Sequence, residues 1–180
     1  HGTAVAGIIG ALRNNSKNVA GISGGNGSGS YDFGTELLDI KLKLSGNPNV
    51  LLHHIASAII KGATSINSNG YGLHVMNNSY SFLVSGSILK QATHIANLNH
   101  VSFVASSGNY PKIPNPTGIA YPATYFDSWV MKVGASDTAG VKSGFSVYAN
   151  SLDFIAPGEV EIVKTLAHNS LNGSVVFNGT

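Results

Sequence analysis

The feature that most constrains the fold is an alternation of short strand-like runs with helical segments in the middle of the chain. Alternating or β-branched apolar side chains predict short strands at residues 39–44, 73–76 and 101–105. Between these strands, residues 50–63 and 84–99 repeat apolar side chains at helical spacing, and Ser85 is a candidate N-cap for the second helix. This order predicts an α/β fold, a doubly wound parallel sheet with helices on both faces.

The flanking segments fit the same architecture. Residues 1–12 carry apolar side chains on one helical face, and Gly7 and Gly10 would let this helix pack closely against a neighbour. Residues 13–35 are polar and rich in glycine, and because no strand leads into them they predict a surface loop, not a phosphate-binding loop. An extended loop is expected around Pro111, Pro114 and Pro116. Further strands are expected at residues 129–134, 152–156 and 161–165.

Composition narrows the class of protein. The chain has 180 residues without a domain-scale linker, so we expect a single domain over residues 1–180. Its ten Lys and Arg residues are scattered and its net charge is only +2, which argues against nucleic acid or an anionic membrane as a partner. There is no cysteine and only 10% of residues are charged, a composition that suits a secreted protein without disulfides.

Polar residues follow two of the predicted strands. In parallel sheets, ligands bind beyond the carboxyl ends of the strands, and the segments 77–81 and 106–109 both lie at such ends. Asn109 could donate its side-chain amide to a developing oxyanion, although a polar turn is the alternative interpretation. His1 opens a predicted helix, where the helix dipole favours a neutral ring that accepts a proton, whereas a frayed terminus is the alternative.

Seven short motifs occur together in a fixed order. They are His1–Gly7 (HGTAVAG), Ser107–Asn109 (SGN), Tyr121–Ala123 (YPA), Val133–Ala135 (VGA), Phe145–Ser146 (FS), Ala156–Gly158 (APG) and Asn178–Thr180 (NGT). In these places and in this order the chain resembles the subtilisin-like serine peptidases, or subtilases, over nearly its whole length. The resemblance implies a subtilisin-like three-layer sandwich and a secreted endopeptidase that acts on polypeptides through a Ser-His-Asp triad.

The resemblance also implies roles for individual residues. His1 matches the general base, and Asn109 matches the oxyanion-hole amide. In the family the nucleophilic serine follows Asn-Gly-Thr at once, and the aspartate lies on a strand before the histidine. Every aspartate of this chain follows His1, and the chain ends at Thr180. We therefore expect a catalytic domain truncated at both ends, and an isolated chain that is inactive.

Substrate binding is implied at two segments. Ser79, Tyr80 and Ser81 match the segment that pairs with the substrate main chain. Ser106, Ser107 and Gly108 match one wall of the pocket for the residue before the scissile bond. Ser81 and Ala120 stand where the family often has glycine, which predicts a restricted pocket suited to medium apolar side chains.

Two further questions are whether the chain binds a metal ion and whether it is an enzyme at all. Asn15 falls where some subtilases bind calcium, but other ligands there come from segments missing here, so we expect the calcium site to be broken in this chain. The implied hydrolysis requires no cofactor. If calcium is bound, its site is expected in the complete parent protein and not in these 180 residues.

The alternative function is a non-catalytic, subtilase-like module that binds peptides. Serine encoded after Thr180, together with an aspartate-bearing strand upstream of His1, would favour the peptidase, and alanine or glycine after Thr180 would favour the binding module.

Overall fold

The computed structural model describes residues 1–17, 19–27, 34–42, 50–109, 118–125, 128–159, 163–170 and 173–180. The chain divides into two compact units. The first unit comprises His1–Asp39, Ser136–Val141 and Pro157–Gly179, and the second comprises Ile40–Ala135, Lys142–Ala156 and Thr180.

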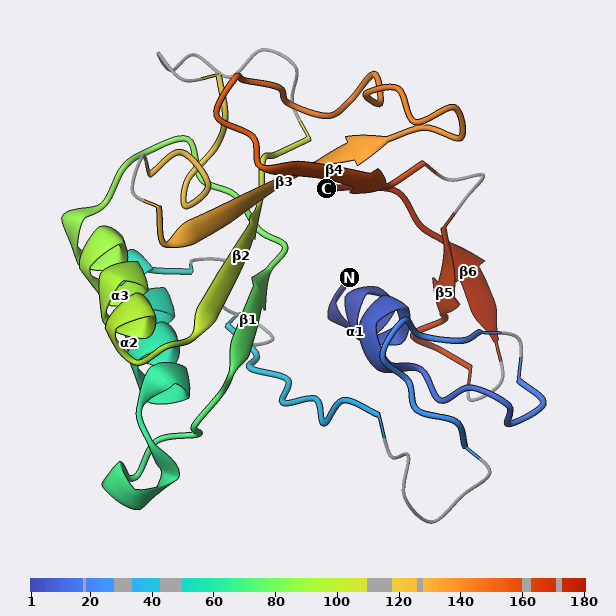
Figure 1. The fold of residues 1–180 in the computed structure, drawn as a ribbon, viewed down its shortest axis with the longest axis horizontal. Helices are drawn as coiled ribbons and strands as arrows, with labels where there is room; N and C mark the ends of the chain where they lie inside the picture. Colours follow the sequence, from blue (N-terminus) through green and yellow to red (C-terminus); the bar gives the residue numbers. More distant parts are fainter. Residues whose placement is uncertain are drawn as a thin grey trace. The chain divides into compact units, whose positions relative to one another are not determined.

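The second unit is built on a sheet with the strand order β1-β2-β3-β4 (Figure 1). The strands are β1 (Val75–Asn78), β2 (Ser102–Ser106), β3 (Val130–Ser136) and β4 (Phe154–Pro157). β1 is parallel to β2, with Asn78 opposite Ala105, and β2 is parallel to β3, with Phe103 opposite Val130. Parallel neighbours need a crossover connection, and α3 (Ser87–Leu98) lies in the connection between β1 and β2.

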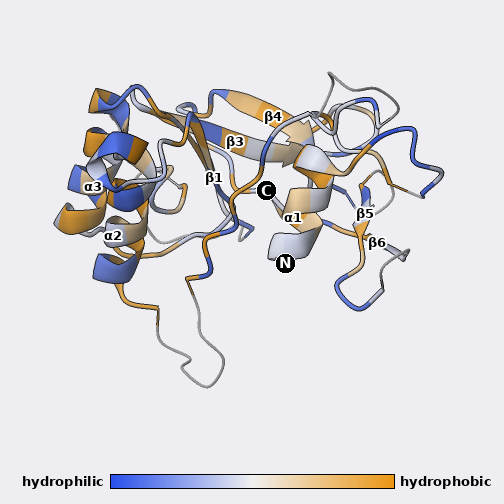
Figure 2. Cartoon of the chain, turned by 90° about the horizontal axis from the view of Figure 1, so that it is seen from below, coloured by the Kyte–Doolittle hydropathy of each residue, from blue (hydrophilic) through white to orange (hydrophobic). Residues whose placement is uncertain are grey.

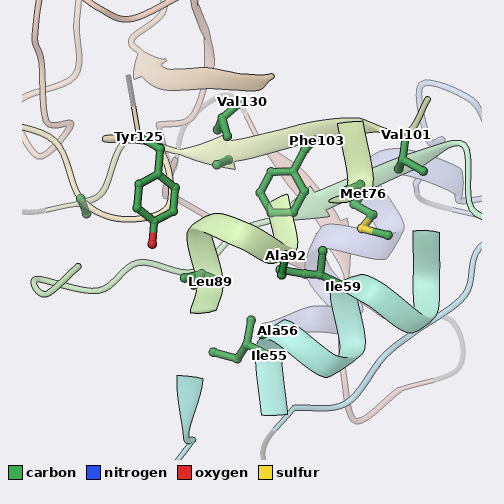
Figure 3. Close-up of a cluster of buried hydrophobic side chains, with 14 of the residues drawn as sticks. Ile55, Ala56, Ile59, Met76, Leu89, Ala92, Val101, Phe103, Tyr125 and Val130 are labelled. Carbon is green, nitrogen blue, oxygen red and sulfur yellow. The ribbon is translucent and has the colours of Figure 1, made fainter. Parts of the chain in front are cut away.

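Two helices, α2 (Leu52–Ala63) and α3, pack on one face of this sheet and enclose its core (Figure 3). Ile55 and Ile59 come from α2, Leu89 and Ala92 from α3, and Phe103 from β2, and each is at most 4% exposed. Burial of a large apolar side chain stabilises a fold by about 1.5–3 kcal/mol. The core therefore fixes the register of the strands whose ends carry the candidate site.

The first unit pairs a helix with a hairpin. Helix α1 (Gly2–Gly10) is pale to orange in Figure 2, because it consists of glycine, alanine, threonine and branched apolar residues. Strands β5 (Lys164–Leu166) and β6 (Ser174–Val176) are antiparallel. The Thr165 hydroxyl donates to the carbonyl of Ala4 (2.5 Å), and a Cβ at Gly7 would collide with that hydroxyl. Gly7 thus permits the close helix packing that its sequence predicts.

Most of the predicted elements are confirmed. The helices expected at residues 1–12, 50–63 and 84–99 are α1, α2 and α3. The strands expected at 101–105 and 129–134 are β2 and β3 within two residues at each end, and β1, β4 and β5 overlap the runs expected at 73–76, 152–156 and 161–165. Residues 161–162 and the proline loop at 111–116 lie outside the described residues.

Three local predictions were wrong. Residues 39–42 are not in a strand. An alternating run forms a strand only when a neighbouring strand pairs with it, and none of the described residues pairs with 39–42. Residues 43 and 44 lie outside the described residues. The N-cap of α3 is Gly86 instead of Ser85, and no side chain caps the helix. Strand β6 was not predicted, since its three residues are too few to establish a period.

Candidate active site

The ends of β1 and β2 place two polar segments at one edge of the sheet (Figure 1). Asn78 lies opposite Ala105 in a parallel pair, so the segments that follow β1 and β2 leave the sheet at neighbouring points. This confirms the prediction that residues 77–81 and 106–109 lie at the carboxyl ends of strands. We call Ser79–Ser81, which follows β1, the open segment. We call Ser106–Gly108, which ends β2 and follows it, the held segment.

The held segment is fixed by hydrogen bonds on several sides. Ser107 is fully buried. Its N–H donates to the carbonyl of Val133 (2.8 Å), its hydroxyl donates to the carbonyl of Val147 (3.0 Å), and its own carbonyl accepts from the N–H of Ala120 (3.0 Å). The carbonyl of Gly108 accepts from the N–H of Val147 (3.0 Å), and Gly108 has a φ of 106°, a conformation that favours glycine. The Ser107 hydroxyl is therefore used to hold the main chain.

Asn109 follows the held segment and is oriented by the last residue of the chain. Its Oδ1 accepts from the N–H of Thr180 (3.0 Å) and from the hydroxyl of Thr180 (2.8 Å). A main-chain N–H can only donate, so the atom that faces Thr180 must be the amide oxygen. The Asn109 side chain is exposed, and its Nδ2 has no hydrogen-bond partner among the described residues. Two N–H donors therefore remain available to an external acceptor.

The open segment presents main chain without partners. Within the described parts of the chain, Ser79, Tyr80 and Ser81 make no main-chain hydrogen bond. Immediately after them, Phe82 pairs with Tyr121 through N–H to carbonyl bonds of 2.9 Å in each direction. The open segment is thus a short stretch of unpaired main chain to which another main chain could add.

The Tyr80 side chain turns back to β1. Its hydroxyl donates to Oδ1 of Asn78 (2.8 Å), and Nδ2 of Asn78 donates to the carbonyls of Met76 (3.1 Å) and Val104 (3.2 Å). Burial of the phenol, and secondarily the nearby Tyr125, raise the pKa of Tyr80 above its usual value near 10. Sequence reasoning placed Asn78 in the polar segment 77–81 but gave its side chain no role. The signal was its spacing of two residues from Tyr80, which places both side chains on one face of an extended chain.

His1 belongs to the first unit. It is the N-cap residue of α1, and its carbonyl accepts from the N–H of Val5 (3.1 Å). Its exposed ring packs edge-on against Phe177, with ring centroids 5.4 Å apart. The predicted position at the start of a helix is confirmed. That His1 and Asn109 face one catalytic site stays a prediction.

Two kinds of feature are absent from the described residues, a group of potential metal ligands and a helix long enough to cross a membrane. No three or more His, Cys, Asp or Glu side chains gather there into a group that could hold a metal ion. Oδ1 of Asn15, the calcium ligand suggested by the resemblance, accepts from the N–H of Lys17 (3.0 Å). In the same part of the chain, no helix combines the length and the hydrophobicity that a membrane span needs.

Comparison with known proteins gives a consistent answer. The model of the subtilase family matches residues 1–180. Subtilisin Savinase of Lederbergia lenta is 36% identical over 178 residues, which are 97% of this chain and 57% of Savinase. An alkaline protease of Shouchella clausii is also 36% identical over 178 residues, again 97% of this chain but 40% of that protein.

A solved structure shows the same fold. A mutant of the protease domain of PatA superposes with a TM-score of 0.73 at 23% identity, over 99% of this chain and 58% of that one. The chain thus spans between 40% and 58% of the length of these three proteins. Its parallel sheet and helices are those of the subtilisin-like α/β fold. Because the family model covers the whole chain and the relatives match it almost throughout, the chain belongs to the subtilase family.

Proposed function

We propose that the complete protein is a secreted serine endopeptidase that hydrolyses peptide bonds with a Ser-His-Asp triad. Membership of the subtilase family, and relatives that are named subtilisin and alkaline protease, support this assignment. In the proposal His1 is the general base, Asn109 is the oxyanion-hole amide, and polypeptides are the substrates. Neither nucleic acid nor a membrane is expected as a partner, and the chemistry needs no cofactor. If calcium is bound, its site is expected in the complete protein.

The observation that carries the proposal is the orientation of Asn109. The amide oxygen is bonded to Thr180, so the amide N–H groups are directed elsewhere. Consecutive Cα atoms are about 3.8 Å apart, so a serine encoded after Thr180 would begin beside this amide. A nucleophile and an oxyanion donor need this proximity, because the oxyanion forms on the carbonyl that the nucleophile attacks.

Each proposed residue has a step in the reaction. The serine hydroxyl attacks the scissile carbonyl while His1 accepts its proton, and Nδ2 of Asn109 donates to the oxyanion of the tetrahedral intermediate. The intermediate collapses to an acyl-enzyme as His1 gives the proton to the leaving amine, and water then releases the acyl group. Serine and aspartate are both expected outside these 180 residues. The isolated chain should therefore be inactive.

Substrate binding is assigned to the two segments at the sheet edge. The unpaired main chain of the open segment would add the substrate as a further strand, which reads any peptide through its main chain. The held segment, with Ser106, Ser107 and Gly108, would form one wall of the pocket for the residue before the scissile bond. Ser81 and Ala120 add bulk there, so medium apolar side chains should fit best.

The test is covalent labelling of the full-length protein with a serine-directed fluorophosphonate. We expect one label, on the residue encoded directly after Thr180, and loss of labelling when that residue is replaced by alanine. A matched variant, Ser170→Ala, changes an exposed serine in the β5–β6 connection and should label like the wild type. Absence of labelling in a folded wild-type protein would refute the peptidase.

A non-catalytic peptide-binding module is the second candidate. The unpaired main chain of the open segment favours it, because strand addition needs no nucleophile. Alanine or glycine after Thr180, together with binding of peptides that are recovered uncleaved, would establish this alternative. Serine at that position together with cleavage would eliminate it.

A further inference from the structure

We propose that Asn78 and Tyr80 form a positioning pair that holds the open segment in the conformation that binds an extended peptide. The pair would thereby set the preference of the enzyme for long substrates over short ones. The inference rests on the proposed peptidase function and adds to it the residue Asn78 and a role for the side chain of Tyr80, both acting through the main chain of Ser79–Ser81.

Asn78 ties the start of the open segment to two strands. Its side chain is only 6% exposed, so its polar atoms need partners inside the protein. Nδ2 donates to the carbonyl of Met76 within β1 and to the carbonyl of Val104 in β2, and Oδ1 accepts from the hydroxyl of Tyr80. The amide thus has bonds to the edge strand, to its neighbour and to the open segment.

Phe82 fixes the other end of the open segment. Its main chain is paired with Tyr121 in both directions, and its ring packs against the ring of Tyr80 with centroids 5.6 Å apart. The segment is therefore held before and after its unpaired residues, and the Tyr80 side chain contacts both anchors. The main-chain groups of Ser79–Ser81 stay unpaired within the described residues.

A segment held in this way loses less conformational freedom when a peptide pairs with it. Removal of the Tyr80 hydroxyl would let the open segment move. Substrates long enough to pair with the segment would then bind more weakly, because the segment must be ordered when they bind. A substrate that ends at the residue before the scissile bond does not span the segment. The consequence is a change in substrate-length preference, carried by KM more than by kcat.

The experiment compares two thiobenzyl esters, of acetyl-Ala-Ala-Ala-Leu and of acetyl-Leu, on the full-length protein. Tyr80→Phe keeps the ring and removes only the hydroxyl. One hydrogen bond corresponds to about a three- to tenfold change, so we expect the ratio of kcat/KM for the long ester to that for the short ester to fall by about this factor. The change should lie in KM for the long ester.

Tyr71→Phe is the matched control, because Tyr71 is exposed, precedes β1 and loses the same atom. It should leave kcat/KM for both esters unchanged.

Asn78→Leu tests the pair. The double variant should have the same long-to-short ratio of kcat/KM as Asn78→Leu alone, because one bond cannot be lost twice. If Asn78→Leu fails to fold, Tyr80→Phe decides the question by itself.

The outcomes separate the inference from the function on which it rests. A wild-type protein that hydrolyses neither ester defeats the proposed peptidase. A wild-type protein that hydrolyses both, with an unchanged long-to-short ratio in Tyr80→Phe, overturns the positioning pair and leaves the peptidase standing. Equal losses on both esters assign Tyr80 a merely structural role and overturn the pair as well.

Discussion

The open and held segments follow neighbouring parallel strands and are similarly polar, yet they are bonded in opposite ways. In the held segment, Ser107 uses its N–H, its carbonyl and its hydroxyl, whereas the open segment has no main-chain partner among the described residues. Part of the cause lies in the sheet order. β2 has a strand on each side, and the N–H of Ser107 donates to Val133 of β3, whereas β1 is an edge strand of the described sheet. The other two bonds of Ser107 go to Ala120 and Val147, which lie outside the strands.

This difference indicates how one sheet edge can serve two purposes. A segment enclosed by neighbours becomes a rigid wall, because its polar groups are already paired. A segment at an edge strand keeps its main-chain groups for another chain. Polar composition alone does not tell the two apart, since both segments are rich in serine.

The largest expected effect is at Asn109, which directly follows the held segment. Asn109→Ala should lower kcat of the full-length enzyme roughly 100- to 1,000-fold, the range known for removal of the oxyanion-hole amide of subtilisin, with little change in KM. Steady-state kinetics on a tetrapeptide ester measure it. A kcat within threefold of the wild type would remove Asn109 from the proposed mechanism.

The next effect concerns the side chain of the open segment that is assigned to the pocket. Ser81→Gly should raise kcat/KM for phenylalanine before the scissile bond about tenfold relative to alanine there, because a smaller wall admits a larger ring. Competition between the two peptides measures the ratio. Ser68→Gly, in the connection between α2 and β1, should leave it unchanged, and an equal shift in both variants would argue against the pocket assignment.

A pair of stability measurements sharpens the comparison. Ser107→Ala removes a buried hydrogen bond and should lower the free energy of unfolding by about 1 kcal/mol. Ser79→Ala removes a hydroxyl that only accepts from Nδ2 of Asn77, an exposed contact, and should cost less than about 0.5 kcal/mol. Urea unfolding of both variants tests this order. The reverse order would mean that the hydrogen bonds do not distinguish the two segments.

The smallest effect is a pH dependence from Tyr80. Its pKa is raised in the folded protein, so its contribution to stability is complete below the unfolded-state pKa near 10 and is lost as the pH rises above that value. At pH 10 half of the unfolded-state phenol is ionised. The free energy of unfolding of the wild type should therefore have fallen by about 0.4 kcal/mol relative to that of Tyr80→Phe. Urea unfolding at pH 8 and pH 10 measures this difference. A constant difference between the two proteins would contradict the raised pKa.

Local periodicity was enough to predict α2, α3 and β2 of the second unit. The helical spacing of Ile55 and Ile59 and the β-branched run at 101–105 each depend on neighbours in sequence, and the parallel order follows from their alternation. β6 and the absence of pairing at 39–42 depend on strands distant in sequence, so no local pattern could reveal them.

The candidate site was predictable in place but not in detail. The carboxyl ends of parallel strands indicated Ser79–Ser81 and Ser106–Asn109. The bond between Asn109 and Thr180 joins residues 71 positions apart, and only the folded chain reveals it. The Asn78–Tyr80 bond was within reach of sequence reasoning, because residues two apart in an extended chain share a face.

A crystal structure of the full-length protein with a bound peptide boronate tests the central claim most directly. We expect a boronate oxygen about 2.7–3.1 Å from Nδ2 of Asn109, the ring of His1 at the same centre, and the peptide paired with the main chain of Ser79–Ser81. A structure in which His1 and Asn109 face opposite sides of the molecule would contradict the account.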